Sequence, residues 1–572
     1  MRWRAERGAR RTGTPCGPAA AVLLLSLAVG CGSGDDPGEP TPSVSSDVLT
    51  GGGGPPDAVR TDGRFAEWEE AVVLFDDPVD APEAAIELGQ IRALDDPRSL
   101  HLSLDLGREV NAQSLPGALR ILVDADDDES TGGSLHGTPG VDLVLTTSYM
   151  ADPDASRGFG LSVRAFVDGE AGEAVDAYPL RVMVAPTFAA SRFEMRISRH
   201  GSSDPPLPRL GPRIRLRLVY VEGGVAVEWT DATAYDFATR ADPALARDVA
   251  AIEARLARPA GTVRVAQLNV SEGSFNQRTV DFARLLAAVE PDVLLLDEVP
   301  AGVDDARMEA FFGLAPFAAL GRWEFVLGAS GGRQRSAVAT RLGGLEPAPA
   351  FADVDYPETT LAELRDGVPE RFHAAIDAEG RRGISTVAAW VPVGGRDVLF
   401  VALDLQSAGW LDSAEDRLRV LQAATILDRA RTAIGRRQPR DGETSRGLSA
   451  LVGGDFNLVG SRTPLDVLSQ LLSGGAGAAG GGAASTDSPL EPVDAERLGE
   501  RTLTTWRSPG APFAAGRLDY LLVPTRHFEV SNAFAFTTED LPAPVLERLA
   551  LEADLSLRLS DHLVLVADVR PR

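Results

Sequence analysis

The rhythm of hydrophobic and polar positions separates two long parts of the chain. From residue 59 to about residue 235, short or alternating apolar runs recur with turn residues between them, a pattern typical of β-strands. The clearest of these runs cover residues 71–74, 100–104, 119–123, 141–145, 162–167, 193–197 and 214–220. We therefore expect residues 58–240 to form an all-β, jelly-roll-like sandwich.

Strands and amphipathic helices alternate in the second part. Apolar residues three and four apart predict helices near residues 282–289 and 418–427, and a connecting helix within residues 241–260. Continuous apolar runs predict buried strands at residues 263–269, 293–296, 398–403, 449–452, 517–523 and 563–569. Polar residues stand at the ends of these strands, so residues 261–572 are expected to form an α+β domain with a site along one rim of its sheets. Residues 346–379 have weak periodicity and are expected to lie near that site.

The first 57 residues follow neither rhythm. Arginines precede a short apolar run at residues 19–29, which indicates a secretory signal that is too short to span a bilayer. The run ends in Leu27-Ala28-Val29-Gly30-Cys31, which resembles a bacterial lipobox. The resemblance implies cleavage before Cys31, a lipid on its thiol, and anchoring in the bacterial cell envelope on the periplasmic or extracellular face. An ordinary signal peptide over residues 1–31 is the alternative. Residues 32–57 are rich in Gly, Ser, Pro and Asp and predict a flexible linker.

The net charge and the cysteine content disfavour or exclude several kinds of binding and catalysis. The formal net charge of −27 disfavours stable binding of duplex nucleic acid, because phosphates would be repelled. The same charge suits a site in which a divalent cation is the main positive charge. Both cysteines, Cys16 and Cys31, precede the globular part, which excludes thiol catalysis and cysteine-bound zinc there.

An acidic stretch follows one of the strands of the first part. Asp124, Asp126 and Asp128 alternate in a way that lets a turn present several oxygens to Ca²⁺. The glycine and the distant glutamate of an EF-hand loop are missing. Two interpretations therefore stay open, a structural Ca²⁺ site and a solvated acidic turn.

The opening of the same part carries a resemblance. Residues 61–68, Thr-Asp-Gly-Arg-Phe-Ala-Glu-Trp, resemble the first strand of family 9 carbohydrate-binding modules and related jelly rolls. The resemblance implies a β-sandwich and a possible polysaccharide partner.

The second part is organised around residues 452–457, Val-Gly-Gly-Asp-Phe-Asn. Side chains alternate along an extended backbone, so Asp455 and Asn457 are expected to point one way and Phe456 the other, into the core. Gly454 leaves room for a close approach of backbone or ligand. A carboxylate and a carboxamide side by side can bind a cation, accept a proton and donate to an oxyanion.

Four further motifs join this stretch, so that five separated motifs follow one another in a single order. They are Gln267-Leu268-Asn269, Asp297-Glu298-Val299, Gly454-Asp455-Phe456-Asn457, Arg517-Leu518-Asp519-Tyr520 and Ser560-Asp561-His562. Their order and spacing resemble the endonuclease/exonuclease/phosphatase superfamily over residues 263–569. The resemblance implies a four-layer, DNase-I-like α/β-sandwich and hydrolysis of a phosphodiester or phosphomonoester by metal-assisted attack of water.

The resemblance also implies roles for single residues. Glu298 is the expected ligand of Mg²⁺ or Mn²⁺, with Asn269 beside it, and Asp561 is expected to add a metal contact. Asp455 is expected to orient or deprotonate the attacking water. Asn457 and His562 are expected to donate hydrogen bonds to the phosphate, with His562 oriented by Asp519.

One position departs from the family pattern. Asp404 stands where most members carry a histidine, and a carboxylate cannot donate a hydrogen bond unless it is protonated. Asp404 recruits a second metal, or Gln406 supplies the donor, or activity is weak. Arg333, Arg335 and Arg382 are candidate phosphate contacts. The leading hypothesis is an exported metal-dependent phosphoesterase. The alternative is a non-catalytic surface protein with a degenerate phosphoesterase domain and a glycan-binding sandwich.

Overall fold

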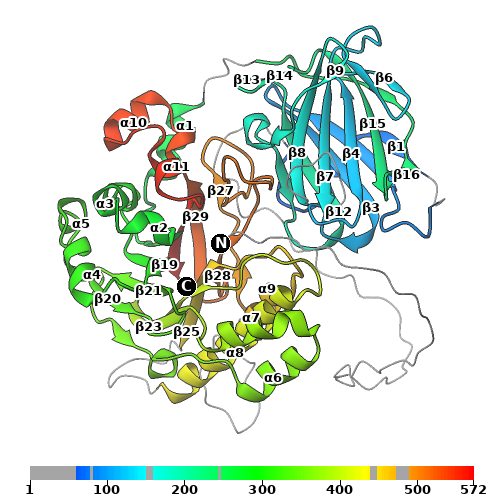
Figure 1. The fold of residues 1–572 in the computed structure, drawn as a ribbon. Coiled ribbons are helices and arrows are strands. Elements are labelled where there is room, and N and C mark those ends of the chain that lie inside the picture. Colours follow the sequence, from blue (N-terminus) through cyan, green and yellow to red (C-terminus); the bar gives the residue numbers. More distant parts are fainter. Residues whose placement is uncertain (1–58, 78–80, 150–158, 243–246, 438–447, 472–488) are drawn as a thin grey trace, which may run out of the picture. The chain divides into compact units, whose positions relative to one another are not determined.

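The computed structural model describes residues 59–77, 81–149, 159–242, 247–437, 448–471 and 489–572 (Figure 1). The predicted signal peptide, the lipidation site at Cys31 and the predicted linker lie outside these residues. None of the helices in the described ranges is both long enough and apolar enough to cross a membrane.

The N-terminal part consists of two main antiparallel sheets. One sheet has five strands in the order β1 (Val72–Asp76), β2 (Gln90–Asp95), β3 (Ser99–Val110), β12 (Ala190–Ser198) and β11 (Met183–Ala185). The other has the central order β10 (Val175–Asp176), β8 (Phe159–Val167), β7 (Leu143–Tyr149), β4 (Ala118–Asp124), β15 (Arg213–Glu222) and β16 (Val225–Trp229), to which β9 (Glu170–Ala171) and β17 (Thr233–Asp236) are added. The hairpins β5 (Gly133–Leu135) with β6 (Thr138–Val141), and β13 (Ser202–Ser203) with β14 (Pro206–Leu207), complete this part.

Alternation of side chains explains why these strands form a sandwich. Along β4, Leu119, Ile121 and Val123 enter the core between the two sheets, whereas Leu122 packs in a smaller cluster on the other face. Apolar side chains from β2, β3, β12 and β15 meet them in the same core. The prediction that the N-terminal part is built of β-strands in packed sheets is confirmed.

The C-terminal part contains a second pair of sheets. The seven-stranded sheet runs β20 (Glu324–Leu327), β21 (Gln334–Thr340), β19 (Val293–Pro300), β18 (Val263–Asn269), β30 (Val564–Pro571), β29 (Phe528–Phe536) and β27 (Glu496–Arg497). The six-stranded sheet runs β22 (Glu346–Pro347), β23 (Thr386–Val393), β24 (Arg396–Asp404), β25 (Ser449–Asp455), β28 (Asp519–Val523) and β26 (Glu491–Pro492). Val265, Leu295, Phe400 and Leu565 contribute to the apolar core between these two sheets.

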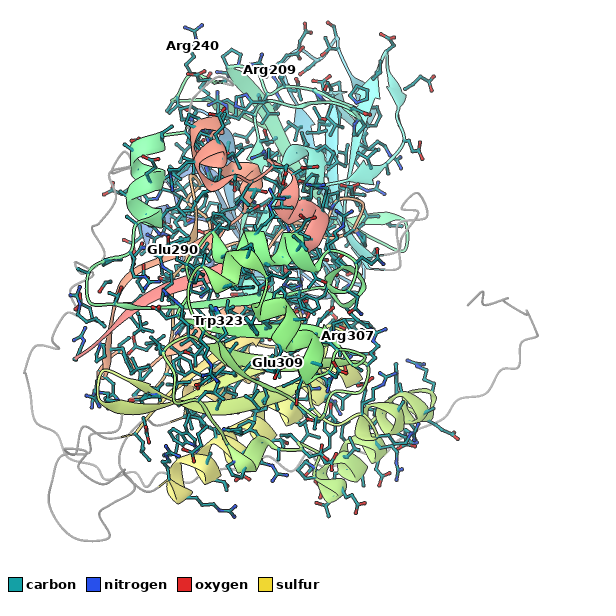
Figure 2. All side chains as sticks on the ribbon, turned by 90° about the vertical axis from the view of Figure 1, so that its left-hand side faces the viewer. Arg209, Arg240, Glu290, Arg307, Glu309 and Trp323 are labelled. Atoms are coloured by element: carbon teal, nitrogen blue, oxygen red, sulfur yellow. The ribbon has the colours of Figure 1, made fainter. Side chains whose placement is uncertain are left out.

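Helices cover the outer face of each sheet. The seven-stranded sheet is covered by α1 (Val249–Leu256), α2 (Glu272–Phe275), α3 (Thr279–Ala287), α4 (Asp305–Phe312), α5 (Ala315–Ala318), α10 (Ala543–Leu549) and α11 (Leu555–Leu559). The six-stranded sheet is covered by α6 (Glu358–Asp366), α7 (His373–Gly380), α8 (Ala414–Arg436) and α9 (Thr463–Ser469). On α4, Met308 is buried in the core of this layer. Arg307 and Glu309 on the same helix are exposed (Figure 2). The layers are therefore helices, sheet, sheet and helices, as the resemblance implied.

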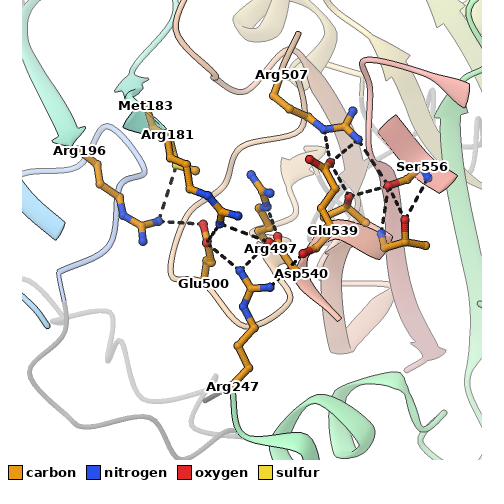
Figure 3. A network of polar contacts seen from close by, with 12 residues as sticks. Arg181, Met183, Arg196, Arg247, Arg497, Glu500, Arg507, Glu539, Asp540 and Ser556 are labelled. Carbon is orange, nitrogen blue, oxygen red and sulfur yellow. Dashed lines mark hydrogen bonds and ion pairs between the residues drawn. The ribbon is translucent and has the colours of Figure 1, made fainter. Parts of the chain in front are cut away.

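Buried ion pairs join the N-terminal sandwich to the C-terminal sheets (Figure 3). Arg196 on β12 donates to Glu500 at 2.9 Å, and Arg181 donates to the other oxygen of Glu500 at 3.1 Å. Arg247 bridges Glu500 and Asp540 at 3.1 and 2.6 Å. Both parts belong to one compact unit, so side chains from the sandwich can take part in a site on the sheets.

Candidate active site

Three aspartates stand side by side because of strand register. Parallel pairing of β24 with β25 places Asp404 next to Asp455, and antiparallel pairing of β25 with β28 places Asp455 next to Asp519. Gly454 makes this close pairing possible: its φ is +153°, and a Cβ there would lie 1.8 Å from the carbonyl oxygen of Leu403. The sequence predicted a close approach at Gly454, and the approaching group is the backbone of the neighbouring strand.

His562 lies between two of these carboxylates. Its Nδ1 is 2.8 Å from Oδ2 of Asp519, and its Nε2 is 3.6 Å from Oδ2 of Asp455. The second oxygen of Asp519 accepts a hydrogen bond from Nε2 of Gln267 at 2.9 Å. Burial lowers the pKa of His562, but the charges of Asp519 and Asp455 outweigh burial and hold the pKa well above 6.5. The two carboxylates therefore favour the imidazolium form of the ring, and Asp519 fixes its Nδ1.

The seven-stranded sheet supplies the opposite side of the site. Nδ2 of Asn269, at the end of β18, donates to Oδ2 of Asp455 at 3.3 Å. The carbonyl oxygen of Asn269 accepts from the hydroxyl of Ser560 at 2.7 Å. Glu298 follows at an irregularity in β19 with φ of +53°, and its Oε2 accepts from the backbone N–H of Glu272 at 3.1 Å. Asn269 thus positions Asp455, while Glu298 faces the open side.

Asp404 occupies the place of the expected histidine and is almost fully buried. Its Oδ2 accepts from Nε2 of Gln334 at 2.7 Å, and its Oδ1 lies 3.5 Å from Nδ2 of Asn457. Burial, together with the charges of Asp455 and Glu298, raises the pKa of Asp404 well above 3.8. Without a cation, the Asp404 carboxyl group is therefore favoured in its neutral form.

Two further carboxyl groups show the same effect. Burial raises the pKa of Asp455 to about 7, against the lowering effect of His562. Burial and the charge of Asp404 raise the pKa of Asp297 well above 3.8. Oδ2 of Asp297 accepts from Gln267 at 2.7 Å and from the backbone of Asp455 at 3.2 Å, but its buried Oδ1 has no hydrogen-bond partner. Asp297 therefore holds the side chain of Gln267 and the backbone of Asp455 in place.

Oxygen atoms of this kind are what Mg²⁺ prefers, so the residues present fit a hard divalent cation. Ligand atoms of Asp455, Asp519 and His562 lie within 4.8 Å of one another. Asp519 and His562 are bonded to each other, however, so their facing atoms are already satisfied. Glu298, Asp404 and Asp561, the ligands expected from the sequence, all line the pocket. In the described part of the chain they are not among the clusters whose ligand atoms lie within 4.8 Å of one another.

The carboxylates open into a pocket of about 800 Å³. Its polar floor consists of Glu298, Asp404, Asp455, Asn457, Asp561 and His562. Its rim carries Trp410, Trp506, Phe513, Arg333 and Arg382. One wall comes from the N-terminal sandwich through Asn111, Gln113, Ser114 and Thr187. The pocket is therefore shared by both parts of the chain.

The sandwich wall is held in place by direct hydrogen bonds. Nδ2 of Asn111 donates to the carbonyl of Gly460 at 3.1 Å, and its Oδ1 accepts from the N–H of Leu411 at 2.7 Å. Oε1 of Gln113 accepts from the N–H of Ala514 at 2.7 Å. These amide side chains orient pocket-lining loops of the C-terminal part, a role that the sequence did not reveal.

The structure brings the predicted site residues together. Asn269 and Asp519 lie just behind the pocket wall, bonded to Asp455 and His562. Gln406 lines the pocket, but its Nε2 donates to the carbonyl of Ser407 at 3.1 Å.

The three candidate phosphate contacts separate. Arg333 and Arg382 line the pocket, whereas Arg335 is not among the lining residues and binds the carbonyl oxygens of Ala301 and Val303. Sequence reasoning assigned no role to Gln267, Asp297, Gln334 or Trp506. Gln267 and Asp297 lie inside two of the five sequence motifs, and this position was the signal that could have revealed them.

Trp506 fixes the remaining predicted metal contact. Its Nε1 donates to Oδ2 of Asp561 at 3.1 Å, and its backbone pairs with that of His562. The residue therefore orients the Ser560-Asp561-His562 motif while its side chain lines the pocket.

The comparisons with solved structures find domains of similar length to the C-terminal part. The human Nocturnin catalytic domain with bound sulfate is 16% identical and covers 55% of this chain and 97% of its own, with a TM-score of 0.33. A 3′-5′ exonuclease from Neisseria meningitidis is 18% identical and covers 54% of this chain and 100% of its own, with a TM-score of 0.32. Truncated TDP2 from Caenorhabditis elegans is 14% identical and covers 54% and 98%, with a TM-score of 0.33. A comparison with curated proteins gives no match.

A family comparison covers the motifs themselves. The sequence matches the Endonuclease/Exonuclease/phosphatase family over residues 266–562, which is more than half of the chain. This range begins within β18 and ends at His562, so it contains the predicted site residues from Asn269 onwards. The chain therefore belongs to the Endonuclease/Exonuclease/phosphatase family.

Proposed function

We propose that this chain is an exported, Mg²⁺-dependent hydrolase of phosphoester bonds. The observation that carries the proposal is the convergence of Glu298, Asp455, Asn457 and the Asp519–His562 pair on one pocket. Family membership supports hydrolysis of a phosphoester. The signal at residues 1–31 and lipidation of Cys31 would hold the enzyme at the cell envelope.

The buried acidic groups support the requirement for a metal. Asp404 and Asp455 have pKa values raised by burial, and like charges this close are unfavourable unless a cation lies between them. Glu298, Asp561 and Asp404 would hold this ion together. Asp404 would then contact the same metal as Glu298 instead of recruiting a second one. A bound Mg²⁺ supplies neutralisation of charge on the phosphoryl oxygens.

The side chains then divide the remaining work. Asp455 orients the attacking water and accepts its proton, a task suited to a carboxyl group whose pKa is about 7. The imidazolium of His562 donates from Nε2 to a phosphoryl oxygen, while Asp519 holds Nδ1. Nδ2 of Asn457 donates to the carbonyl oxygen of Leu405 at 2.9 Å and lies 3.5 Å from Oδ1 of Asp404, so its second N–H is the donor that would serve the phosphate. Trp506 holds the carboxylate of Asp561 in place through the hydrogen bond from its Nε1.

The pocket supports small phosphoesters as substrates. Its volume of about 800 Å³ is in the range of small-molecule sites, and the sandwich wall limits its extent. Trp410 and Phe513 offer apolar surface, and Arg333 and Arg382 offer positive charge near the rim. The net charge of −27 disfavours long duplex DNA. Lipid head groups and short nucleotides share the required chemistry of a phosphoester beside an organic group.

The proposal is tested with the purified chain and two chromogenic substrates, a phosphodiester and a phosphomonoester. We expect turnover that requires Mg²⁺ or Mn²⁺, is abolished by chelator, and falls at least about 10²-fold in Asp455→Asn. Asp428→Asn on the exposed face of α8 is the matched control and should keep wild-type activity. Turnover unaffected by chelator, or equal in Asp455→Asn and wild type, would overturn the assignment.

One observation favours a second candidate, a non-catalytic surface protein whose sandwich binds glycans. Asp404 has replaced the histidine expected at this position, as in a domain that has lost activity. This candidate predicts no metal-dependent turnover in the wild type together with retention of the chain on an immobilised polysaccharide panel. Turnover without retention on the panel would leave the sandwich as a wall of the active site.

A further inference from the structure

A second acidic cluster lies in the N-terminal sandwich, outside the active-site pocket. Asp124 ends β4, Asp126 follows in the next turn, and Asp142 precedes β7. Each contributes a carboxylate oxygen, and these atoms lie within 4.8 Å of one another. Antiparallel pairing of Val123 with Leu143 brings the third aspartate to the first two across the sheet.

Asp124 carries an unpaired oxygen in the interior. The residue is only 2% exposed, and its Oδ2 is buried without a hydrogen-bond partner. Its Oδ1 accepts from the backbone N–H of Asp128 at 3.1 Å. Burial raises the pKa of Asp124, and the charges of Asp142 and Asp126 raise it further. A buried carboxylate oxygen without a partner is costly, so the site favours a positive group that can reach it.

The neighbouring carboxylates of the same turn are already neutralised. Asp127 pairs with Arg213 at 2.7 Å and with Arg215 at 3.0 Å, and Glu129 pairs with Arg215 at 2.5 Å. In the described part of the chain, by contrast, no ion pair reaches Asp124, Asp126 or Asp142 (their bonds are to N–H and hydroxyl groups). The arginines therefore pair with the neighbouring carboxylates rather than with those of the cluster.

Asp128, one of the residues expected to bind Ca²⁺ with its side chain, lies differently. Its Oδ1 accepts from the N–H of Ser130 at 2.9 Å and from the hydroxyl of Ser130 at 2.6 Å. Its main-chain oxygen is better placed. A Cβ on Gly140 would lie 2.8 Å from Oδ2 of Asp124 and 3.1 Å from the carbonyl oxygen of Asp128. The glycine, with φ of +73°, keeps open a space that both oxygens border.

We propose that Asp124, Asp126 and Asp142 form a Ca²⁺ site that fastens the turn after β4 to the segment before β7. Carboxylates and a peptide carbonyl in an irregular arrangement suit Ca²⁺, which accepts six to eight oxygens in flexible geometry. They suit Mg²⁺ less, because it demands near-octahedral geometry and keeps several waters. Ca²⁺ bound to the folded state alone stabilises the sandwich in proportion to its occupancy.

The test separates this site from the active site. The full chain carries Glu298→Gln, excess Mg²⁺ is present to fill the active-site pocket, and Ca²⁺ is titrated by calorimetry and by thermal unfolding. In this background we expect one saturable Ca²⁺ site and a rise in Tm of several degrees. Asp126→Asn should raise the Kd for Ca²⁺ about tenfold or more. Because Asp126 is exposed, this variant is expected to fold.

Two further variants complete the design. Asp124→Asn should lose the Ca²⁺-dependent rise in Tm, with circular dichroism confirming that it is folded. Asp128→Asn is the matched control, because its carboxylate is bonded to Ser130, and it should keep both the affinity and the Tm shift. The site is refuted if the background chain shows no saturable Ca²⁺ binding, or if Asp126→Asn binds Ca²⁺ as the background does. Loss of binding in Asp128→Asn equal to that in Asp126→Asn would also refute the assigned ligands.

Discussion

At the scale of single residues, the surroundings of an aspartate decide its role. Asp519 is fully buried, and its two oxygens are bonded to Gln267 and His562. Asp455, its partner on the next strand, faces the pocket and has a pKa raised to about 7 by burial. The first residue is therefore fixed as an orienting charge, whereas the second can exchange a proton near neutral pH.

Asp519→Asn removes the charge that keeps His562 protonated. Burial then lowers the pKa of His562 with less opposition, so the imidazolium is lost at lower pH than in wild type. If His562 donates to the phosphate, activity disappears as pH rises through this pKa. We expect kcat to fall about 10²-fold or more and the alkaline limb of the kcat profile to move to lower pH. An unshifted limb would show that His562 does not act as the proton-bearing donor.

Asp404→Asn tests whether this carboxylate holds a cation. The amide removes one negative charge but retains the shape of the side chain near Gln334 and Asn457. We expect the Mg²⁺ concentration for half-maximal activity to rise about tenfold, with a smaller change in kcat at saturating Mg²⁺. Glu415→Gln, a pocket-lining carboxylate with no assigned ligand role, is the control. Unchanged Mg²⁺ dependence in Asp404→Asn would remove Asp404 from the ligands.

The local pattern alone predicted residues whose role depends on their own strand, and it did not predict residues whose role depends on another strand. The pairing of Asp519 with His562 was expected only from the family resemblance. Alternation along residues 452–457 predicted that Asp455 faces the site and Phe456 faces the core, where Phe456 packs against Tyr520. Gln334 lies in a different sheet from Asp404, and their hydrogen bond arises only when the two sheets pack. Nothing local in the sequence marks such a pair.

At the scale of elements, strong apolar runs predicted strands and weak ones hid them. The run at residues 263–269 is β18, and the run at residues 398–403 lies within β24. Strand β21, Gln-Arg-Ser-Ala-Val-Ala-Thr, has small side chains and a weak hydrophobic signal, although Ala337 to Ala339 are fully buried. Helices α6 and α7 lie in the weakly periodic segment. Their faces are only partly covered by the core, so they do not need a regular apolar stripe. Packing between sheets, rather than the local hydrophobic pattern, therefore determines where these strands and helices form.

Gly454→Ala tests the pairing of β24 with β25. A Cβ would collide with the carbonyl oxygen of Leu403 at 1.8 Å, and a φ of +153° disfavours any other residue. We expect a loss of about 1–3 kcal/mol in the free energy of unfolding, and a loss of activity as Asp404 separates from Asp455.

The matched substitution is Gly435→Ala in α8, where a Cβ meets nothing within 4 Å. It should stabilise the chain by about 0.5–1 kcal/mol, because alanine favours a helix over glycine. Urea unfolding measures both variants. Equal stability of Gly454→Ala and wild type would mean that the two strands are not held at this distance.

At the scale of the whole molecule, buried ion pairs make the sandwich part of the enzyme. Glu500 and Asp540 accept bonds from arginines on both sides of the junction, including Arg196 and Arg247 (Figure 3). Close by, Arg507 donates to Glu539 at 2.8 Å and to the carbonyl of Ser560 at 2.8 Å. These neighbouring charges therefore hold the sandwich, through Arg196, and the segment that carries His562, through Arg507.

Glu500→Gln measures how much this junction contributes. Burial raises the pKa of Glu500, but Arg196, Arg497, Arg181 and Arg247 lower it further, so the net pKa lies well below 4.5. The stabilisation from the ionised group is full above pH 4.5 and is lost as pH falls below that value. We expect Glu500→Gln to cost about 3–5 kcal/mol at pH 7, because Arg196 and Arg247, which are largely buried, lose their partner.

The decisive readout is the slope of stability against pH rather than stability at one pH. Between pH 5 and pH 3 we expect the free energy of unfolding to fall more steeply in wild type than in Glu500→Gln. In this range the unfolded wild-type chain takes up a proton on Glu500 that the folded chain does not, and the variant has no such group. Glu253→Gln breaks an exposed pair with Arg548 and should change stability by less than about 1 kcal/mol and leave the slope intact. If Glu500→Gln had the wild-type slope, the carboxylate would not be ionised in the folded chain, and the junction would be held by packing and main-chain bonds instead.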